Sequence, residues 1–185
     1  MTNFTRAVIL DTFDQLLEST PFEKITVSAI IKTCGISRNT FYYHFQDIYA
    51  LLDAWLQREL GIYTYPAEEA AWAARMKELL YACRENRKKI YHLYHSAPRG
   101  RIEQYLFRAA DEQAGAYVST LIGPRQVSPQ RTAGVVDLVR YAIIGFFLRF
   151  LAGNMADDID SSVDALRTLF KEVVEHILLE NAENE

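Results

Sequence analysis

The sequence predicts an all-α fold in which a small N-terminal helical domain precedes a larger helical domain. Hydrophobic residues recur at the three- and four-residue spacings of amphipathic helices along almost the whole chain, whereas the alternating pattern of strands is scarce. Half of the 185 residues are hydrophobic and 24% are charged, which is the composition of a globular protein. The helical patterning restarts after glycine, threonine and proline cluster at residues 61–66, so domains are expected at residues 1–60 and 61–185.

The first helix is predicted from an apolar face with helical spacing, and it ends before Pro21. This face consists of Ile9, Phe13, Leu16 and Leu17. Proline lacks a backbone donor and disfavours helical geometry in the residue before it, so the helix cannot continue there. Thr26 is the expected N-cap of a second, short helix that runs to Thr33.

A glycine-containing corner joins the second helix to the third. Gly35 permits the positive φ that a tight corner between helices often needs, and Ser37 can then cap a helix over residues 38–45. Asp47 is the expected N-cap of a fourth helix, which runs to about Leu60.

Five further helical segments are expected in the rest of the chain. They cover residues 67–86, 87–95, 100–121, 130–152 and 160–180. The last segment carries a wide apolar stripe of Val163, Leu166, Leu169, Phe170, Val173, Val174, Ile177 and Leu178. The most apolar region, residues 135–151, is interrupted by three charged side chains and is interpreted as a buried helix, because a membrane span needs about 20 apolar residues.

The charge distribution bears on which partners the chain can have. The formal net charge is −4, which argues mildly against a nucleic-acid partner because strong DNA binders often carry a basic excess. However, the segment from Lys24 to Gln46 contains three basic residues and no acidic one. Local charge decides how a surface meets phosphates, so this segment can still bind nucleic acid, with modest affinity for each protomer.

Motifs for catalysis and metal binding are missing from the sequence. There is no glycine-rich phosphate loop, nucleophile motif or metal-ligand cluster, so no enzymatic activity, cofactor or metal is expected. His92 and His95 have a spacing that could hold a metal, but no nearby cysteine or carboxylate completes a site. Cys34 and Cys83 match no metal-ligand spacing, and the N-terminus lacks the signal-peptide pattern, which favours a cytoplasmic protein.

The two short helices joined by the corner form a helix-turn-helix pattern. The second helix of such a motif can lie in the major groove of DNA, where its N-terminal side chains reach base edges. Arg38 can bond guanine and Asn39 can bond adenine. Phe41 and Phe45 have the spacing of core residues, so the three residues between them, Tyr42, Tyr43 and His44, are expected to point largely outward.

Three sequence motifs make this interpretation more specific. They are Thr26-Val27-Ser28-Ala29-Ile30, Cys34-Gly35-Ile36-Ser37 and Thr40-Phe41-Tyr42-Tyr43-His44-Phe45. Together with the paired leucines Leu51 and Leu52, their order and spacing resemble the N-terminal domain of the TetR family of transcriptional regulators over about residues 5–60. The aromatic run at residues 41–49 also resembles the subgroup that includes regulators of dihydroxyacetone kinase genes.

The resemblance implies a sequence-specific DNA-binding regulator and assigns roles to residues by position. The implied base readers are Ser28, Arg38 and Asn39. The implied phosphate or backbone contacts are Thr26, Thr40, Tyr42 and His44. Tyr43 could take either role, and Lys32 is a further candidate whose alternative is an ordinary solvated lysine.

The sequence departs from the family pattern at two positions. Ile48 stands where the family often has a lysine that meets a phosphate, and Asn39 stands where it often has glycine or alanine. The N-terminal arm is short and carries no basic residue before Arg6, so the arm is not expected to reach the minor groove.

The resemblance further implies a C-terminal domain that dimerises and often binds a small molecule. The helices at 130–152 and 160–180 are apolar enough to form a four-helix interface with a second protomer, although both could instead be the core of a monomer. An effector pocket could be lined by aromatic residues, which helical spacing more often places in a core. These residues are Tyr81, Tyr91, Tyr94, Tyr105, Phe107, Tyr117 and Tyr141, with His92 nearby.

How the protein would regulate is left open by the sequence. Repression as a homodimer, with release by a small-molecule effector, is the expected mode, because occupying an operator blocks polymerase without further contacts. An activator or co-regulator that acts through protein interactions, with weak or no DNA binding, is the alternative.

Overall fold

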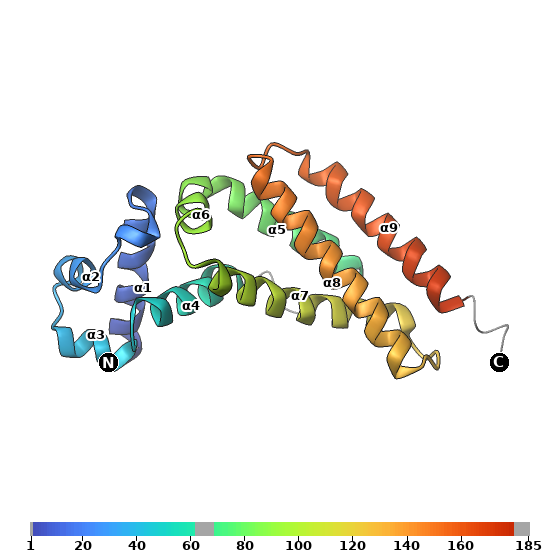
Figure 1. Ribbon diagram of the computed structural model, residues 1–185, viewed down its shortest axis with the longest axis horizontal. Coiled ribbons are helices and arrows are strands. Elements are labelled where there is room, and N and C mark those ends of the chain that lie inside the picture. Colours follow the sequence, from blue (N-terminus) through green and yellow to red (C-terminus); the bar gives the residue numbers. More distant parts are fainter. Residues whose placement is uncertain (1, 62–68, 180–185) are drawn as a thin grey trace. The chain divides into compact units, whose positions relative to one another are not determined.

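The computed structural model describes residues 2–61 and 69–179. These residues form nine α-helices and one short 3-10 turn and contain no strand, which confirms the predicted all-α class (Figure 1). They divide into two compact units. The first unit takes its residues from 1–62 and 85–105, and the second takes its residues from 63–84 and 106–185.

The first unit is built around α1. Its elements are α1 (Thr2–Ser19), the 3-10 turn η1 (Phe22–Lys24), α2 (Val27–Cys34), α3 (Arg38–His44), α4 (Ile48–Glu59), α6 (Arg87–Tyr94) and the start of α7 (Arg99–Ile122). The helices α2, α4 and α6 all pack against α1 (Figure 1). The unit therefore contains the helices expected in residues 1–60 together with a segment from later in the chain.

The helix boundaries of the first unit follow from the predicted caps. Thr26 and Ser37 each accept a hydrogen bond from the backbone amide three residues on, at 3.1 and 3.0 Å. Asp47 accepts bonds from two amides of the first turn of α4, at 2.8 and 2.7 Å. Gly35 has a φ of 68°, the left-handed conformation in which a side chain would be strained, and it ends α2. These local predictions are confirmed.

Aromatic side chains dominate the core between α1, α3 and α4. Phe13 is fully buried and meets the rings of Phe22 and Trp55 edge to face, each with a centroid separation of 6.1 Å. Trp55 also donates a hydrogen bond from Nε1 to Asp14 at 3.1 Å, which satisfies its buried polar atom. Other fully buried members are Ile9, Leu17, Ile30, Phe41, Leu51 and Leu52.

Helix α6 is joined to α1 by polar contacts. The ammonium group of Lys89 lies 2.7 Å from Asp14 and 3.3 Å from Glu18. The Nδ1 atom of His92 lies 2.6 Å from the carbonyl oxygen of Leu17. Burial of Lys89 tends to lower its pKa, but the hydrogen bonds and charges of Asp14 and Glu18 together outweigh burial, so the pKa is raised above its ordinary value of 10.5.

The first turns of α7 are joined to α4 in the same way. Arg101 pairs with Asp53 at 2.5 Å, and its guanidinium lies 5.3 Å from the ring centroid of Tyr49. The hydroxyl of Tyr105, a buried residue, donates to the carbonyl of Leu56 at 3.0 Å. The segment 85–105 is therefore integral to the first unit.

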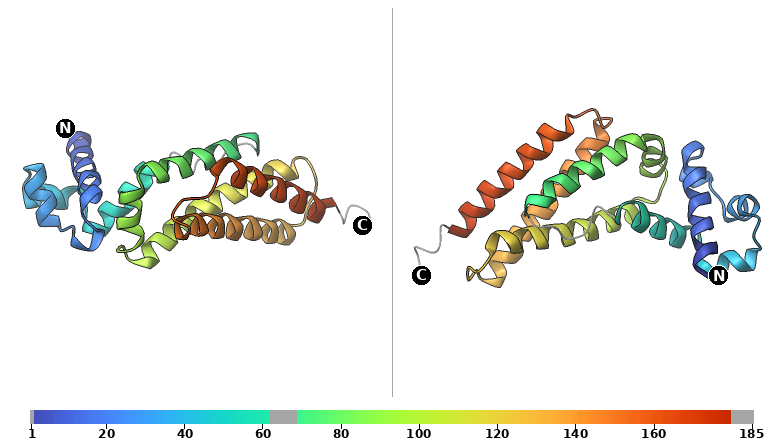
Figure 2. Two further views of the ribbon diagram at one scale, coloured as in Figure 1. Left: turned by 90° about the horizontal axis from the view of Figure 1, so that it is seen from above. Right: turned by 180° about the vertical axis from the view of Figure 1, so that it is seen from behind.

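The second unit contains α5 (Glu69–Glu85), the rest of α7, α8 (Pro129–Ala152) and α9 (Ile159–Leu179). The helices α8 and α9 run side by side in both views of Figure 2. Trp72 packs between Tyr117 and Phe170 at the centre of this unit, with ring separations of 5.6 and 5.5 Å. Its buried Nε1 has no hydrogen-bond partner among the described residues.

Helix α5 is tied to the start of α9 by a polar cluster. Lys77 lies 2.9 Å from Asp164 and 3.2 Å from Asp160, and the hydroxyl of Tyr81 donates to Asp160 at 2.8 Å. The hydrogen bond from Tyr81 and the charge of Lys77 lower the pKa of Asp160 below its ordinary value.

Helices α8 and α9 each bury one side and expose an apolar stripe on the other. The α8 stripe consists of Gly134, Leu138, Tyr141, Gly145 and Ala152. The α9 stripe consists of Ala165, Leu169 and Val173. The expectation that residues 135–151 form a buried helix therefore holds for only one side of α8, because periodicity identifies apolar positions but not what covers them.

Three sequence-based expectations concern residues outside the described ranges. These are most of the boundary at residues 61–66, the start of the segment 67–86 and the final residue of the segment 160–180. Among the helices that are described, none is both long enough and apolar enough to cross a membrane.

Candidate nucleic-acid interface

Helix α3 is fixed to the core by two phenylalanines and exposes the residues between them. Phe41 and Phe45 are buried, which confirms their predicted core role. Tyr43 is 75% exposed and Tyr42 is 44% exposed, whereas His44 is half-buried with its ring 5.1 Å from that of Tyr43. Two large aromatic side chains with hydroxyl groups therefore face solvent on a seven-residue helix.

The N-terminal residues of α3 are also exposed. Arg38 and Asn39 both face solvent in the first turn. The guanidinium of Arg38 lies 5.7 Å from the ring centroid of Tyr42, so a cation–π contact holds it along the helix. Both residues have the donor groups that can read purine bases in a major groove.

Four more residues with predicted DNA contacts differ in their exposure and in their hydrogen bonds. Ser28 and Lys32 are exposed on α2. The hydroxyl oxygen of Thr26 accepts the capping bond of α2, so its proton remains able to donate to a phosphate. Thr40 is half-buried, and its hydroxyl lies 2.8 Å from that of Ser37.

We name six exposed side chains of α2 and α3, all of them predicted DNA contacts, the recognition surface. It consists of Ser28, Lys32, Arg38, Asn39, Tyr42 and Tyr43. These are six of the nine residues for which DNA contacts are predicted. The other three, Thr26, Thr40 and His44, lie on the same two helices or cap them.

The N-terminus of α4 is already occupied by a carboxylate. Asp47 accepts bonds from two of its free amides, and Ile48 follows as the first helical residue. Backbone amides at a helix start are a common phosphate site, but here they donate to an anionic side chain. The end of α3 therefore meets a helix start at which two amides are already bonded to a carboxylate and no basic side chain is present.

Ion pairs neutralise most acids of residues 2–61. Arg58 pairs with Asp11 and Glu59, while Lys89 and Arg101 pair with three more. Those three are Asp14, Glu18 and Asp53. Of the two remaining acidic residues, Asp47 caps α4, and Glu23 forms no ion pair with a described residue.

Apart from Arg58, the arginines and lysines of the same range form no such pairs. Arg6, Lys24, Lys32 and Arg38 are exposed and form no ion pair with a described residue. The positive charge of these four residues is therefore free to meet phosphates, although the chain as a whole carries a net charge of −4.

Sequence reasoning gave Arg6 no role, because it looked for a flexible arm. Helix α1 begins at Thr2, so Arg6 lies on the helix and not in an arm. Its guanidinium lies 5.4 Å from the ring centroid of Phe45, at the end of α3. A basic residue at the start of an amphipathic helix was the available signal, but Phe45, its neighbour in space, lies far along the chain.

The aromatic residues predicted for an effector pocket fall in both units. Tyr91, Tyr94 and Tyr105 belong to the first unit. There, Tyr91 stacks on His95 with a centroid separation of 5.3 Å, and Tyr105 bonds α4.

The remaining four aromatic residues belong to the second unit. Tyr117 is buried against Trp72, and Tyr81 bonds Asp160. Phe107 and Tyr141 form an exposed edge-to-face pair with ring centroids 6.1 Å apart. Their contacts thus lie in different clusters of side chains.

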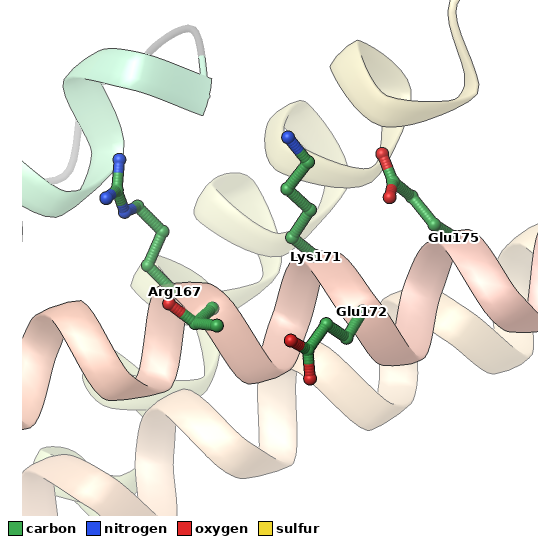
Figure 3. A pocket seen from close by; sticks show the side chains of 5 residues that line it. Arg167, Lys171, Glu172 and Glu175 are labelled. Carbon is green, nitrogen blue, oxygen red and sulfur yellow. The ribbon is translucent and has the colours of Figure 1, made fainter.

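A pocket of about 350 Å³ lies beside α9. Its lining residues are Arg167, Thr168, Lys171, Glu172 and Glu175. Arg167, Lys171 and Glu175 project to the same side of the helix, whereas Glu172 points away from them (Figure 3). Two basic and two acidic side chains suit a polar ligand, and none of these residues was predicted from the sequence.

Two family models match the chain. Residues 9–55 match "Bacterial regulatory proteins, tetR family", and residues 70–177, more than half of the chain, match "Transcriptional regulator C-terminal region". The chain belongs to the TetR family. It is therefore a DNA-binding transcriptional regulator, as the sequence motifs indicate.

A solved structure supports the fold of the regulator. The dihydroxyacetone kinase operon activator DhaS resembles it with a TM-score of 0.58 and 19% sequence identity, over 95% of each chain. At this identity the likeness extends to the fold alone. No curated protein sequence matches the regulator.

Proposed function

We propose that the regulator binds a duplex DNA operator through the recognition surface, as a homodimer that represses transcription. The observation that carries this proposal is the exposed set of donors on α2 and α3, whose basic members form no ion pair with described residues. Residues 1–60 form the DNA-binding domain in this proposal, and residues 61–185 form the dimerisation and effector domain. A cytoplasmic location follows, because that is where a bacterial operator lies.

The proposed contacts divide between bases and phosphates. Ser28, Arg38 and Asn39 read bases, because they stand at exposed positions of α2 and the first turn of α3. The proposed phosphate and backbone contacts are Thr26, Lys32, Thr40, Tyr42 and His44. Tyr43 is exposed enough to reach either kind of group.

The α8 and α9 stripes support the homodimer. Leu169 and Tyr141 are each 56% exposed, and an exposed apolar surface of this kind is typical of an interface between proteins. A Cβ added at Gly134 or Gly145 would meet no atom within 4 Å, so both positions are open to the approach of another helix. Pairing both stripes with their copies would give a four-helix interface.

Two-fold symmetry also suits the reading of an operator. Two recognition helices that meet successive major grooves must lie about 34–36 Å apart. A small-molecule effector that favours a different spacing would release the operator, with a coupling of about 1–3 kcal/mol. The aromatic residues predicted from the sequence and the polar pocket beside α9 are the two candidate regions for such an effector.

Selection from a random duplex library, with and without candidate metabolites, tests the proposal and identifies the operator. We expect the double variant Arg38→Ala, Tyr42→Ala to weaken operator binding in a gel shift by at least tenfold, because a good base contact contributes about 1–3 kcal/mol. Unchanged binding would contradict the proposed site.

Arg87→Ala is the matched control for the loss of Arg38. Arg87 is exposed on α6 and lies 5.6 Å from the ring centroid of Tyr91, much as Arg38 lies over Tyr42. Like Arg38→Ala, the substitution Arg87→Ala removes a positive charge from a cation–π contact, but it does so outside the recognition surface. We expect its operator affinity to equal that of the wild type.

An activator or co-regulator that acts through protein interactions is the second candidate. The carboxylate at the start of α4 favours it, because it bonds two of the amides that could otherwise meet a phosphate. The similar structure is also that of an operon activator. If the wild-type protein selected no duplex from the library, this candidate would replace the first.

A further inference from the structure

Arg6 lies at the point where α3 ends and α4 begins. It is exposed on α1, and its guanidinium lies 5.4 Å from the ring centroid of Phe45, the C-cap of α3. Figures 1 and 2 both place the start of α1 beside this junction. A residue from the beginning of the chain thus lies beside the end of α3, the helix that carries Tyr42 and Tyr43 of the recognition surface.

The charge of Arg6 is not used by the fold. Arg58, Lys89 and Arg101 each pair with a carboxylate and so join helices of the first unit. No described acidic residue pairs with Arg6, and its described contact is the face of an aromatic ring. A cation without an anionic partner at the edge of a DNA-facing surface is available for a phosphate.

The other positive charge near this end of the recognition surface is already paired, because Arg101, which lies over the ring of Tyr49, pairs with Asp53. Residues 46–50 contain no basic side chain, and Asp47 accepts hydrogen bonds from two of the amides that start α4. A phosphate near this junction would therefore meet the carboxylate of Asp47 unless a cation offset it. Arg6 stands at the position from which it can do so.

We propose that Arg6 binds a backbone phosphate of the operator at the α3–α4 end of the recognition surface. The planar guanidinium can donate two parallel hydrogen bonds to a phosphate. The ring of Phe45 beneath it restricts the side chain before DNA arrives, which lowers the entropy cost of the contact. The inference rests on the proposed operator binding and adds a contact from α1, which the recognition surface does not include.

The salt dependence of operator binding tests this inference. The probe is the duplex that the wild-type protein selects from the random library, labelled with fluorescein and titrated at several salt concentrations. For Arg6→Gln we expect the slope of log affinity against log salt to become shallower by about 0.9 for each bound protomer. At 0.1 M salt this corresponds to an affinity loss of about fivefold to tenfold for each contact.

Two further variants separate a phosphate contact from other causes. Arg6→Lys keeps the charge, so its salt slope is expected to stay close to that of the wild type. Arg87→Gln removes an exposed charge on α6, and its slope is expected not to change. The unfolding midpoint of Arg6→Gln should match that of the wild type, since the side chain is exposed.

The inference is overturned if Arg6→Gln keeps the wild-type slope, or if Arg6→Lys loses as much slope as Arg6→Gln. It is also overturned if Arg87→Gln lowers the slope equally, because net charge would then be the cause. If the wild-type protein selects no duplex, the proposed function itself fails, which is a different result from binding without a role for Arg6.

Discussion

The recognition surface and the two apolar stripes are both exposed to solvent, but their side chains differ in chemistry. The recognition surface carries hydroxyl, amide and unpaired cationic groups on two short helices. The stripes carry glycine, alanine and large apolar groups on two helices of 24 and 21 residues. The chain therefore presents one surface suited to a polyanion and another suited to an apolar partner.

The difference between these surfaces lies in how each is supported. The seven-residue α3 is held in place by two buried phenylalanines and a serine cap. Loss of one of these residues would therefore displace the exposed residues of the helix. Helix α8 buries six large side chains along its length, so a change on its exposed stripe leaves its position intact. Substitutions should therefore act differently at the two surfaces.

The largest effect is expected from Phe41→Ala, which removes a fully buried anchor of α3. Truncating a buried phenylalanine costs about 3–5 kcal/mol, so thermal or urea unfolding should show a large loss of stability in the first unit. Tyr43→Ala, two positions on and exposed, is the control and should unfold like the wild type. Equal losses in both variants would contradict the anchoring role of Phe41.

The next effect concerns the stripe on α8. Gly145→Arg places a charge where an added Cβ meets open space, so the protomer should fold at least as well as before. We expect light scattering to report a monomer, and operator affinity to fall by about a hundredfold or more because two linked half-sites are lost.

Gly100→Arg provides the matched control for this change. Gly100 is also exposed, helical and open to an added Cβ, but it lies outside the stripes. It should keep the wild-type mass. A dimeric Gly145→Arg protein would show that another surface joins the protomers.

A smaller effect is expected from removing a single hydroxyl in the recognition surface. Tyr43→Phe keeps the ring, so stability should not change, while one hydrogen bond to DNA worth about 1 kcal/mol is lost. Operator affinity measured by fluorescence anisotropy should fall about fivefold. Tyr81→Phe deletes a hydroxyl that bonds Asp160 in the second unit and should leave this affinity unchanged.

An effect of similar size concerns pH and the contact between α1 and α6. The pKa of Lys89 is raised in the folded protein, so its charge stabilises the first unit fully below pH 10.5, and this contribution is lost as pH rises through the raised value. Near neutral pH, Lys89→Met should lower the free energy of unfolding by about 1–2 kcal/mol. The gap between the two proteins should close in alkaline urea titrations. A gap that persisted there would contradict this assignment.

What could be predicted from the sequence depended on the distance between the residues involved. The caps Thr26, Ser37 and Asp47 bond amides two or three positions away, so short motifs were sufficient to identify them. The joining of residues 85–105 to the first unit could not be predicted. It depends on contacts such as that between Lys89 and Asp14, which lie 75 positions apart.

The candidate site shows the same dependence on distance. The outward position of Tyr42 and Tyr43 follows from the spacing of Phe41 and Phe45 within one helix. The place of Arg6 depends on a ring contact between α1 and the end of α3. The contact roles of these residues with DNA stay predictions until an operator is in hand.

The distribution of tryptophan has a practical consequence. The chain contains two tryptophans, and Trp55 lies in the core of the first unit while Trp72 lies in the core of the second. The indole of Trp55 donates to a carboxylate, whereas that of Trp72 is enclosed by aromatic rings. Replacing either one by phenylalanine leaves a single intrinsic fluorophore, so the emission of each variant would follow one unit at a time during unfolding or ligand titration.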